Sequence, residues 1–225
     1  MKFNGSAKVI LIVLFVSVIN GTLQASSEVP AAGIVKHHQL WNGFVDKLYR
    51  LHRKRLRDHD YYTFEKSGGY GGATNNLEYY RQVDYFDRKD RQLLSSIKWE
   101  NVYPFGIHMI DMPAFDQNGR LIREYSATYL PSRRTSPFET LITLHYYKDS
   151  LHSFREFDAS NIRLYEQCQD TNSGRVIFAL NYEDIPESLS ALDQAQREAY
   201  QACFAHTESS AEPYTDPSKD PLLKQ

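Results

Sequence analysis

The sequence predicts an α+β fold, in which an N-terminal amphipathic helix packs on a twisted, mainly antiparallel β-meander of about seven to nine strands, followed by a short C-terminal helix. Three observations lead to this prediction. Apolar residues recur at three- and four-residue steps over residues 35–58. Short alternating segments with turn signals fill residues 79–182, and a second helical period covers residues 186–204.

The composition is that of an ordinary globular protein. The chain has 225 residues, of which 41% are hydrophobic and 24% are charged, so it is neither a disordered nor a collagen-like polymer. Its 26 lysines and arginines against 28 aspartates and glutamates leave a formal charge of -2, so no overall basic field favours a nucleic-acid partner. We expect one α+β domain over residues 28–206.

The first 27 residues have the pattern of a secretory signal peptide. Lys2 and Lys8 precede a run over residues 9–19 that is apolar except for Ser17, and small residues follow at positions 25–27. The run is shorter than the roughly 20 residues that cross a bilayer as a helix, so we expect no transmembrane anchor after cleavage. The sequence therefore predicts an exported protein, periplasmic or extracellular.

The predicted helix over residues 35–58 has a strongly basic polar face. It contains seven lysines and arginines but only two aspartates. Arg50, Arg53 and Arg57 on this face are candidate binding residues for an acidic partner surface, a phosphate or an anionic membrane face. The alternative is a solvated helix face whose arginines pair with acidic residues of the sheet.

A glycine-rich loop separates this helix from most of the strands. Residues 67–72 read Ser-Gly-Gly-Tyr-Gly-Gly, a composition that suits neither a helix nor a strand interior. The loop leads into the strand-like residues 77–86 rather than into a helix that opens with a Lys-Ser/Thr pair, which argues against a phosphate cradle. Tyr70 at the tip of the loop is a candidate contact residue.

Turns between strands are marked by three Phe-Asp pairs, which are Phe86-Asp87, Phe115-Asp116 and Phe157-Asp158. In the clearest of these turns Asp116 caps the turn with its side chain, and Gly119 supplies the positive φ that a tight hairpin requires. Between the turns apolar residues alternate with polar ones. We therefore expect one face of the sheet to be core and the other to be partly solvated.

The C-terminal region is predicted to be a short helix followed by a tail. Cys168 and Cys203 are the two cysteines of the chain, and in an oxidising compartment they predict a disulfide that ties the helix over residues 186–204 to a strand. Residues 207–225 contain three prolines and no apolar period before Leu222, which predicts a disordered tail.

Two histidines and a carboxylate gather on one predicted hairpin. A turn at Asp149-Ser150 brings His145, Tyr147, His152 and Glu156 to the same face of the two strands. Two imidazoles and a carboxylate can bind zinc, so His145, His152 and Glu156 are candidate metal ligands. The alternative is a pair of surface histidines on a tyrosine-rich sheet.

Tyrosines are abundant enough to indicate a contact surface. The chain contains 16 of them, and they fall on both faces of the predicted sheet. Tyrosine offers a rigid apolar body with a hydrogen-bonding tip, which suits protein or sugar contacts, and Tyr79, Tyr80 and Tyr147 join Tyr70 as candidate binding residues. The alternative is that these rings fill the margin of a half-exposed sheet.

The function that these patterns favour is that of an exported, non-enzymatic binding protein of the cell envelope or extracellular space. It would contact another protein or an envelope component through its tyrosine-rich sheet face and its basic helix. The first alternative is a periplasmic carrier that encloses a lipid or other apolar ligand. The second is a metal-dependent hydrolase that uses His145, His152 and Glu156. The known spacings of nucleophiles, acids and bases are absent, so no catalytic residue and no cofactor are predicted.

Overall fold

The computed structural model describes residues 32–68, 80–101, 106–129 and 136–224. The chain divides into two units, Met1–Pro30 and Ala31–Gln225, and every described residue belongs to the second unit. The predicted signal peptide and the candidate contact residues Tyr70 and Tyr79 lie outside the described residues. None of the described helices is long and apolar enough to cross a membrane.

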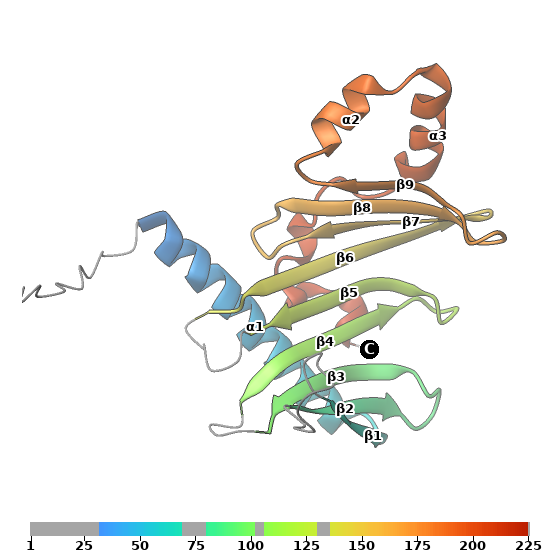
Figure 1. The fold of residues 1–225 in the computed structure, drawn as a ribbon. Helices are drawn as coiled ribbons and strands as arrows, with labels where there is room; N and C mark the ends of the chain where they lie inside the picture. Colours follow the sequence, from blue (N-terminus) through green and yellow to red (C-terminus); the bar gives the residue numbers. More distant parts are fainter. Residues whose placement is uncertain (1–31, 69–79, 102–105, 130–135, 225) are drawn as a thin grey trace, which may run out of the picture. The chain divides into compact units, whose positions relative to one another are not determined.

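Within the described residues, nine strands form one antiparallel sheet, and neighbouring strands follow each other in chain order (Figure 1). Helix α1 (Ala32–Asp58) precedes the sheet, and helices α2 (Ile185–Ala191) and α3 (Gln194–Phe204) follow it. The strands are β1 (Tyr61–Gly68), β2 (Tyr80–Asp87), β3 (Leu93–Glu100), β4 (Ile107–Phe115), β5 (Leu121–Thr128), β6 (Glu139–Lys148), β7 (Leu151–Phe157), β8 (Arg163–Asp170) and β9 (Val176–Asn181). The predicted antiparallel meander is therefore confirmed.

Aspartates close four hairpin turns of the described sheet in the same way. Asp87, Asp116, Asp158 and Asp170 each accept hydrogen bonds from backbone amides two to four residues further along the chain. Each turn contains a residue with positive φ, such as Gly119 at 75°. A register shift accompanies every turn, because one strand carries an extra residue there. The Phe-Asp pairs predict the first three turns.

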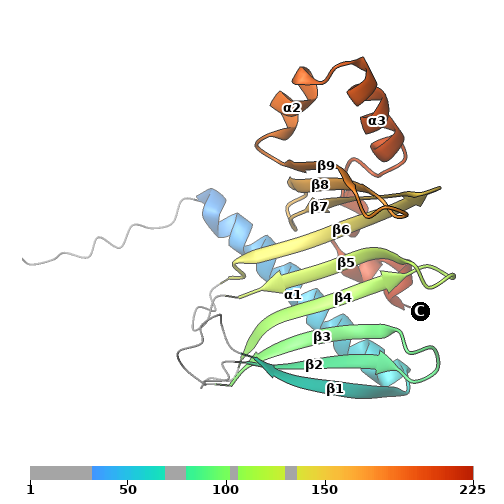
Figure 2. The ribbon, with the colours of Figure 1, turned by 45° about the vertical axis from the view of Figure 1, so that its right-hand side comes forward.

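Helix α1 buries its apolar stripe against one face of the sheet, and Figures 1 and 2 show it running behind the middle strands. Phe44, Leu48 and Leu51 lie on this stripe at the three- and four-residue spacing that the sequence shows. Their partners in the sheet include Ile97, Ile110, Met112, Tyr125, Ala127 and Ile142, all 0% exposed. Burying each large apolar side chain stabilises the fold by about 1.5–3 kcal/mol.

The disulfide between Cys168 of β8 and Cys203 of α3 is present, as predicted. It joins the last helix to the sheet, and Phe204 is buried beside it. The helical period over residues 186–204 is divided into α2 and α3, because Leu192 between them is extended (φ -64°, ψ 135°) and Asp193 begins α3 with a capping box.

Residues 207–224 pack against the core, and the prediction of a disordered tail is wrong for them. They form three short 3-10 helices, η1 (Glu212–Tyr214), η2 (Pro217–Lys219) and η3 (Pro221–Lys224). Leu223 and Asp220 are each 1% exposed. Pro217 is the first residue of η2 and Pro213 is the second residue of η1. The N–H groups at these positions have no partner within a helix, so proline is tolerated there and does not prevent these short helices.

Candidate binding face

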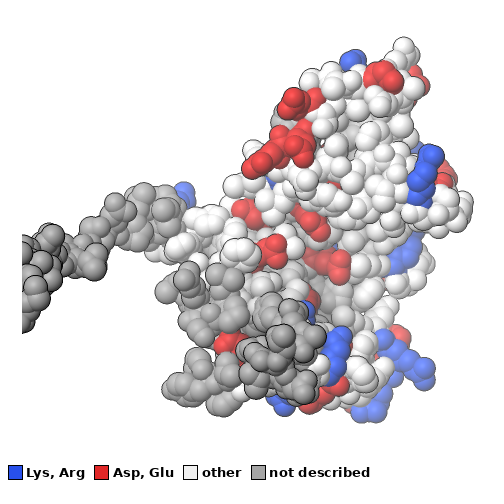
Figure 3. All heavy atoms as spheres, viewed as in Figure 1, with Lys and Arg blue, Asp and Glu red and all other residues white. Residues whose placement is uncertain are grey.

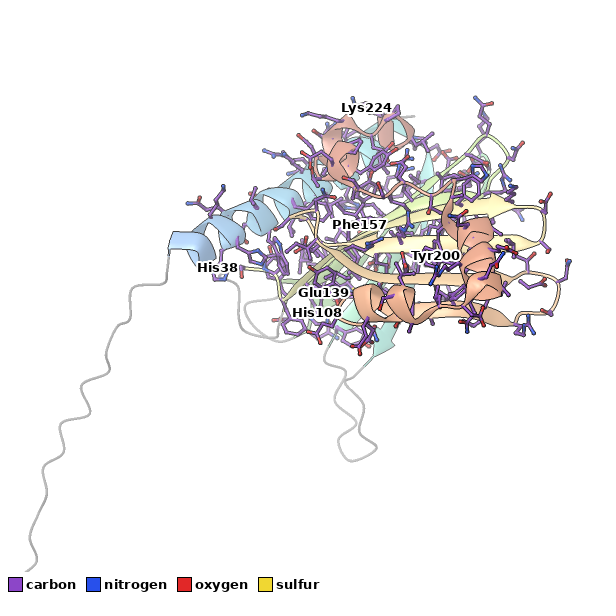
Figure 4. The ribbon with its side chains drawn as sticks, turned by 90° about the horizontal axis from the view of Figure 1, so that it is seen from above. His38, His108, Glu139, Phe157, Tyr200 and Lys224 are labelled. Carbon is purple, nitrogen blue, oxygen red and sulfur yellow. A yellow bond between two sulfur atoms is a disulfide. The ribbon has the colours of Figure 1, made fainter. Side chains whose placement is uncertain are left out.

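The side chains of α1, α3 and residues 207–224 contact one face of the sheet, and we call the opposite face the open face. The strand register places side chains of β2 to β8 there, among them Tyr80, Asp84, Ser96, Lys98, Asp111, Glu124, Glu139, Thr143, His145, Tyr147, His152, Phe154 and Glu156. Figure 4 shows Glu139 on the side of the sheet away from α1. The open face is thus rich in polar and aromatic groups.

Polar groups on the open face are deeply buried in places. Ser96 is 4% exposed, Thr143 6% and Asp84 8%. The hydroxyl of Ser96 and the amide of Gln82 both donate to Asp84 Oδ1, at 2.6 and 2.7 Å. Burial raises the pKa of Asp84, but these hydrogen bonds and the ammonium of Lys66, 3.6 Å from Asp84 Oδ2, outweigh it, so the pKa lies below its usual value. Asp84 is therefore a stable anion in this face.

Two other carboxyl groups of the open face are in the opposite situation. Burial raises the pKa of Asp111 to about 6, and the nearby carboxylates of Glu124 and Asp84 act in the same direction. Burial likewise raises the pKa of Glu156, and the charges of Glu139 and Glu124 add to the effect. A cation placed among these groups would stabilise their charged forms, because it would offset both burial and like-charge repulsion.

The histidines lie where the sequence predicts them. The β6–β7 register pairs Tyr147 with His152, as expected from a turn at Asp149-Ser150. His145 Nδ1 lies 3.0 Å from His152 Nε2, and His145 Nε2 lies 3.1 Å from Glu124 Oε2. The ring of Tyr147 stacks on His152 with centroids 4.5 Å apart. Burial and the neighbouring His145 lower the pKa of His152, which favours its neutral form.

The described residues do not arrange this cluster as a metal centre. No group of three or more His, Cys, Asp or Glu side chains in the described part of the chain is placed to hold a metal ion. Both ring nitrogens of His145 are engaged, one with His152 and one with Glu124. Glu156 lies across from Thr143 in the register and hydrogen-bonds to neither imidazole. The geometry of the described residues therefore does not support the interpretation of His145, His152 and Glu156 as zinc ligands.

Tyr80 contributes an aromatic ring at another part of the open face. It stacks on His108, with ring centroids 5.9 Å apart, and Lys98 Nζ lies 5.7 Å from its ring centre. A lysine ammonium at this distance from a ring makes a cation–π interaction. The face thus already accommodates one cation against an aromatic ring.

The three predicted arginines of α1 lie outside the open face. Arg50, Arg53 and Arg57 are exposed, and none of them forms an ion pair with a described residue. The ion pairs of this helix belong to its lysines, Lys47 with Asp216 and Lys54 with Asp58, each at 3.0 Å. The alternative that the arginines pair with the sheet is thus not seen.

Among the carboxylates of the open face only Glu156 was a candidate from the sequence, and the gathering of Asp84, Asp111 and Glu124 was not predicted. Asp111 stands in the middle of an apolar strand, and this interruption is the signal that could have identified it. Asp84 and Glu124 look like ordinary solvated strand residues, because only the register of the four strands β2 to β5 brings them near Asp111. Figure 3, viewed from the open side, shows acidic side chains gathered over the middle of the sheet.

Comparisons with known proteins add no functional information. The chain matches no protein-family model, no curated protein and no solved structure. The function of the protein is therefore inferred from the geometry of the described residues alone.

Proposed function

We propose that the protein is an exported, non-enzymatic binding protein and that its open face binds a cationic segment of another protein or envelope component. The observation that carries this proposal is the crowding of five carboxyl groups on one sheet face, namely Asp84, Asp111, Glu124, Glu139 and Glu156. Burial raises the pKa of Asp111 and of Glu156, and the neighbouring carboxylates of this face raise both further, so a bound cation would be favoured over a further anion.

The aromatic rings beside these carboxyl groups support the same chemistry. Tyr147 and Phe154 flank the histidines, and Tyr80 lies close to Lys98. Rings next to carboxylates suit the side chains of lysine and arginine, whose apolar stems pack on a ring while the charged end reaches an oxygen. A basic segment of a partner protein matches this combination better than an apolar ligand does.

The exposed arginines of α1 are proposed as a second contact surface, for an acidic partner. Arg50, Arg53 and Arg57 are free of ion pairs among the described residues, which supports this reading over a self-paired helix face. The alternatives receive less support. Of three cavities in the described chain, the one at the C-terminal end of α1 is lined mainly by polar groups and the other two mix polar with apolar side chains, so none of the three has the continuous apolar wall of a lipid carrier. No group of described side chains is placed to hold the metal ion of a hydrolase.

The proposal is tested with a fluorescent oligolysine peptide titrated into the purified protein and followed by anisotropy. An oligoglutamate peptide of the same length is the control ligand. We expect saturable binding of the oligolysine alone, weakened by salt because the contacts are ionic. Binding should also weaken as the pH falls through 6, because Asp111 then becomes neutral.

Two variants locate the contact. Glu156→Gln removes one charge from the open face, and we expect it to weaken oligolysine binding about 2- to 5-fold, the usual worth of one accessible ion pair. Glu183→Gln removes an exposed charge after β9 and should leave binding unchanged. Equal affinities for the two peptides, or equal effects of the two variants, would contradict the proposal.

A further inference from the structure

A cavity lies at the C-terminal end of α1, away from the open face. It has a volume of about 220 Å³ and is bounded by α1, by the β2–β3 and β4–β5 turns and by η3. This volume is below the roughly 300–1,000 Å³ of pockets for drug-sized ligands, so it suits a smaller molecule. Most of the side chains that line it are polar or charged.

The guanidinium of Arg55 lies in the wall of this cavity with part of its hydrogen-bonding capacity unused. Arg55 is 8% exposed, and its Nη1 donates to the carbonyls of Leu94 and Pro113, at 2.7 and 3.2 Å. Its Nε is buried without a partner, and its Nη2 donates to no described residue. No described carboxylate forms an ion pair with it. Burial lowers the pKa of Arg55 to about 10, and Asp220, Asp87 and Asp90 offset this only from a distance, without contacting the guanidinium. A bound anion would supply the direct partner that Nε and Nη2 lack.

Side-chain amides beside Arg55 are also unused. Gln92 and Gln117 both line the cavity, and neither side-chain amide hydrogen-bonds to a described residue. Together with Arg55 they supply donors of the kind that a carboxylate accepts. The donors come from three elements that are distant in sequence, so only the folded chain brings them together.

The rim of the cavity carries the opposite charge. Asp87 and Asp116 are already occupied, Asp87 by His59 and Asp116 by Arg120. Asp90 is exposed, and it accepts one hydrogen bond, from the backbone amide of Gln92, but forms no ion pair within the described chain. A ligand whose carboxylate binds Arg55 would therefore have Asp90 near its other end. A positively charged group at that end would be attracted by Asp90, whereas a second negative charge would be repelled.

We propose that this cavity binds a small zwitterion of the α-amino acid class, with its carboxylate on Arg55 and its ammonium facing Asp90. Gln92 and Gln117 would donate to the carboxylate from the side. The two charges of such a ligand match the two unpaired charges of the cavity. This site shares no residue with the open face, so a test of ligand binding here is independent of the function proposed above.

The experiment is isothermal titration calorimetry of the intact mature chain with three matched probes. L-Alanine carries both charges, propionate lacks the ammonium, and ethylamine lacks the carboxylate. We expect saturable binding of L-alanine that is at least about tenfold tighter than that of either single-charge probe, because each charged contact contributes about 1.5–3 kcal/mol. Equal binding of propionate would overturn the role of Asp90, and no saturable binding of L-alanine would overturn the site.

Two exposed variants test the residues without disturbing the core. We expect Asp90→Asn and Gln117→Ala each to weaken L-alanine binding several-fold, while Asp149→Asn and Gln194→Ala, at exposed positions elsewhere, leave it unchanged. Arg55→Gln should abolish binding. If that buried variant does not fold, Asp90→Asn and Gln117→Ala decide the question, and unchanged affinity in both would refute the proposal.

Discussion

Asp220 fixes the C-terminal segment to the sheet through a buried ion pair, and the variant Asp220→Asn tests its contribution. The carboxylate accepts from Arg123 Nε and Nη2 at 2.7 Å each and from the hydroxyl of Tyr125 at 2.6 Å. The side chain of Asp220 is 0% exposed and that of Arg123 10%. Removing the charge of Asp220 leaves the Arg123 guanidinium buried without its counter-ion.

The expected cost follows from this burial. Removing one partner of a buried ion pair lowers the free energy of unfolding by about 3–5 kcal/mol. For a chain of this size each kcal/mol corresponds to about 2–4 °C in Tm, so we expect Tm to fall by about 10 °C. A double variant Arg123→Met/Asp220→Asn should recover part of the loss, because it leaves no unpaired buried charge.

The assay is urea denaturation of the purified protein, followed by circular dichroism at pH 7 and at lower pH. Burial raises the pKa of Asp220, but the hydrogen bonds from Arg123 and Tyr125 outweigh it and hold the pKa below 3.8. The stabilisation from Asp220 is therefore fully present above pH 3.8 and is lost as the pH falls through the lower folded-state pKa. The Asp220→Asn variant should lack this acid-dependent loss.

Unfolding of Asp220→Asn at the same urea concentration as the unchanged protein would contradict a stabilising role of this ion pair. A loss of unfolding free energy in the double variant equal to the sum of the losses in the two single variants would also contradict it, since coupled charges give a non-additive result.

Three further predictions concern stability. Replacing Cys168 and Cys203 by Ser should lower the free energy of unfolding by about 3–4 kcal/mol in urea titrations, because the disulfide closes a loop of 35 residues. Gly119→Ala should cost about 1–2 kcal/mol in the same assay, because φ there is 75°; a neutral result would contradict the turn geometry. Burial, with a smaller effect of Arg53, lowers the pKa of His52 to about 4. Stability should therefore decrease as the pH falls from 6.5 to 4, and a His52→Gln variant should lack this dependence.

The sheet could be predicted largely because its signals are local. The aspartate that caps each turn and the positive-φ residue that follows lie within a few positions of each other, so one short segment specifies the hairpin. The register of β6 and β7 followed from the turn at Asp149-Ser150 alone. The disulfide was predictable because only two cysteines are present.

The C-terminal segment could not be predicted, because the contacts that order it are distant in sequence. Arg123 and Asp220 are 97 positions apart, and neither residue alone indicates a buried partner. The same limit applies to the cavity at Arg55. In the sequence, Arg55 looks like one more cation of a basic helix. Its burial depends on Leu94 and Pro113, 39 and 58 positions away.

A titration of the isotope-labelled protein with oligolysine, followed by backbone amide chemical shifts, would locate the binding surface on the sheet. We predict that the shifts which change belong to β4, β5, β6 and β7 around Asp111, Glu124 and Glu156. Changes confined to the Arg50, Arg53 and Arg57 surface of α1, or no change at any amide, would contradict the assignment of the open face as the binding surface.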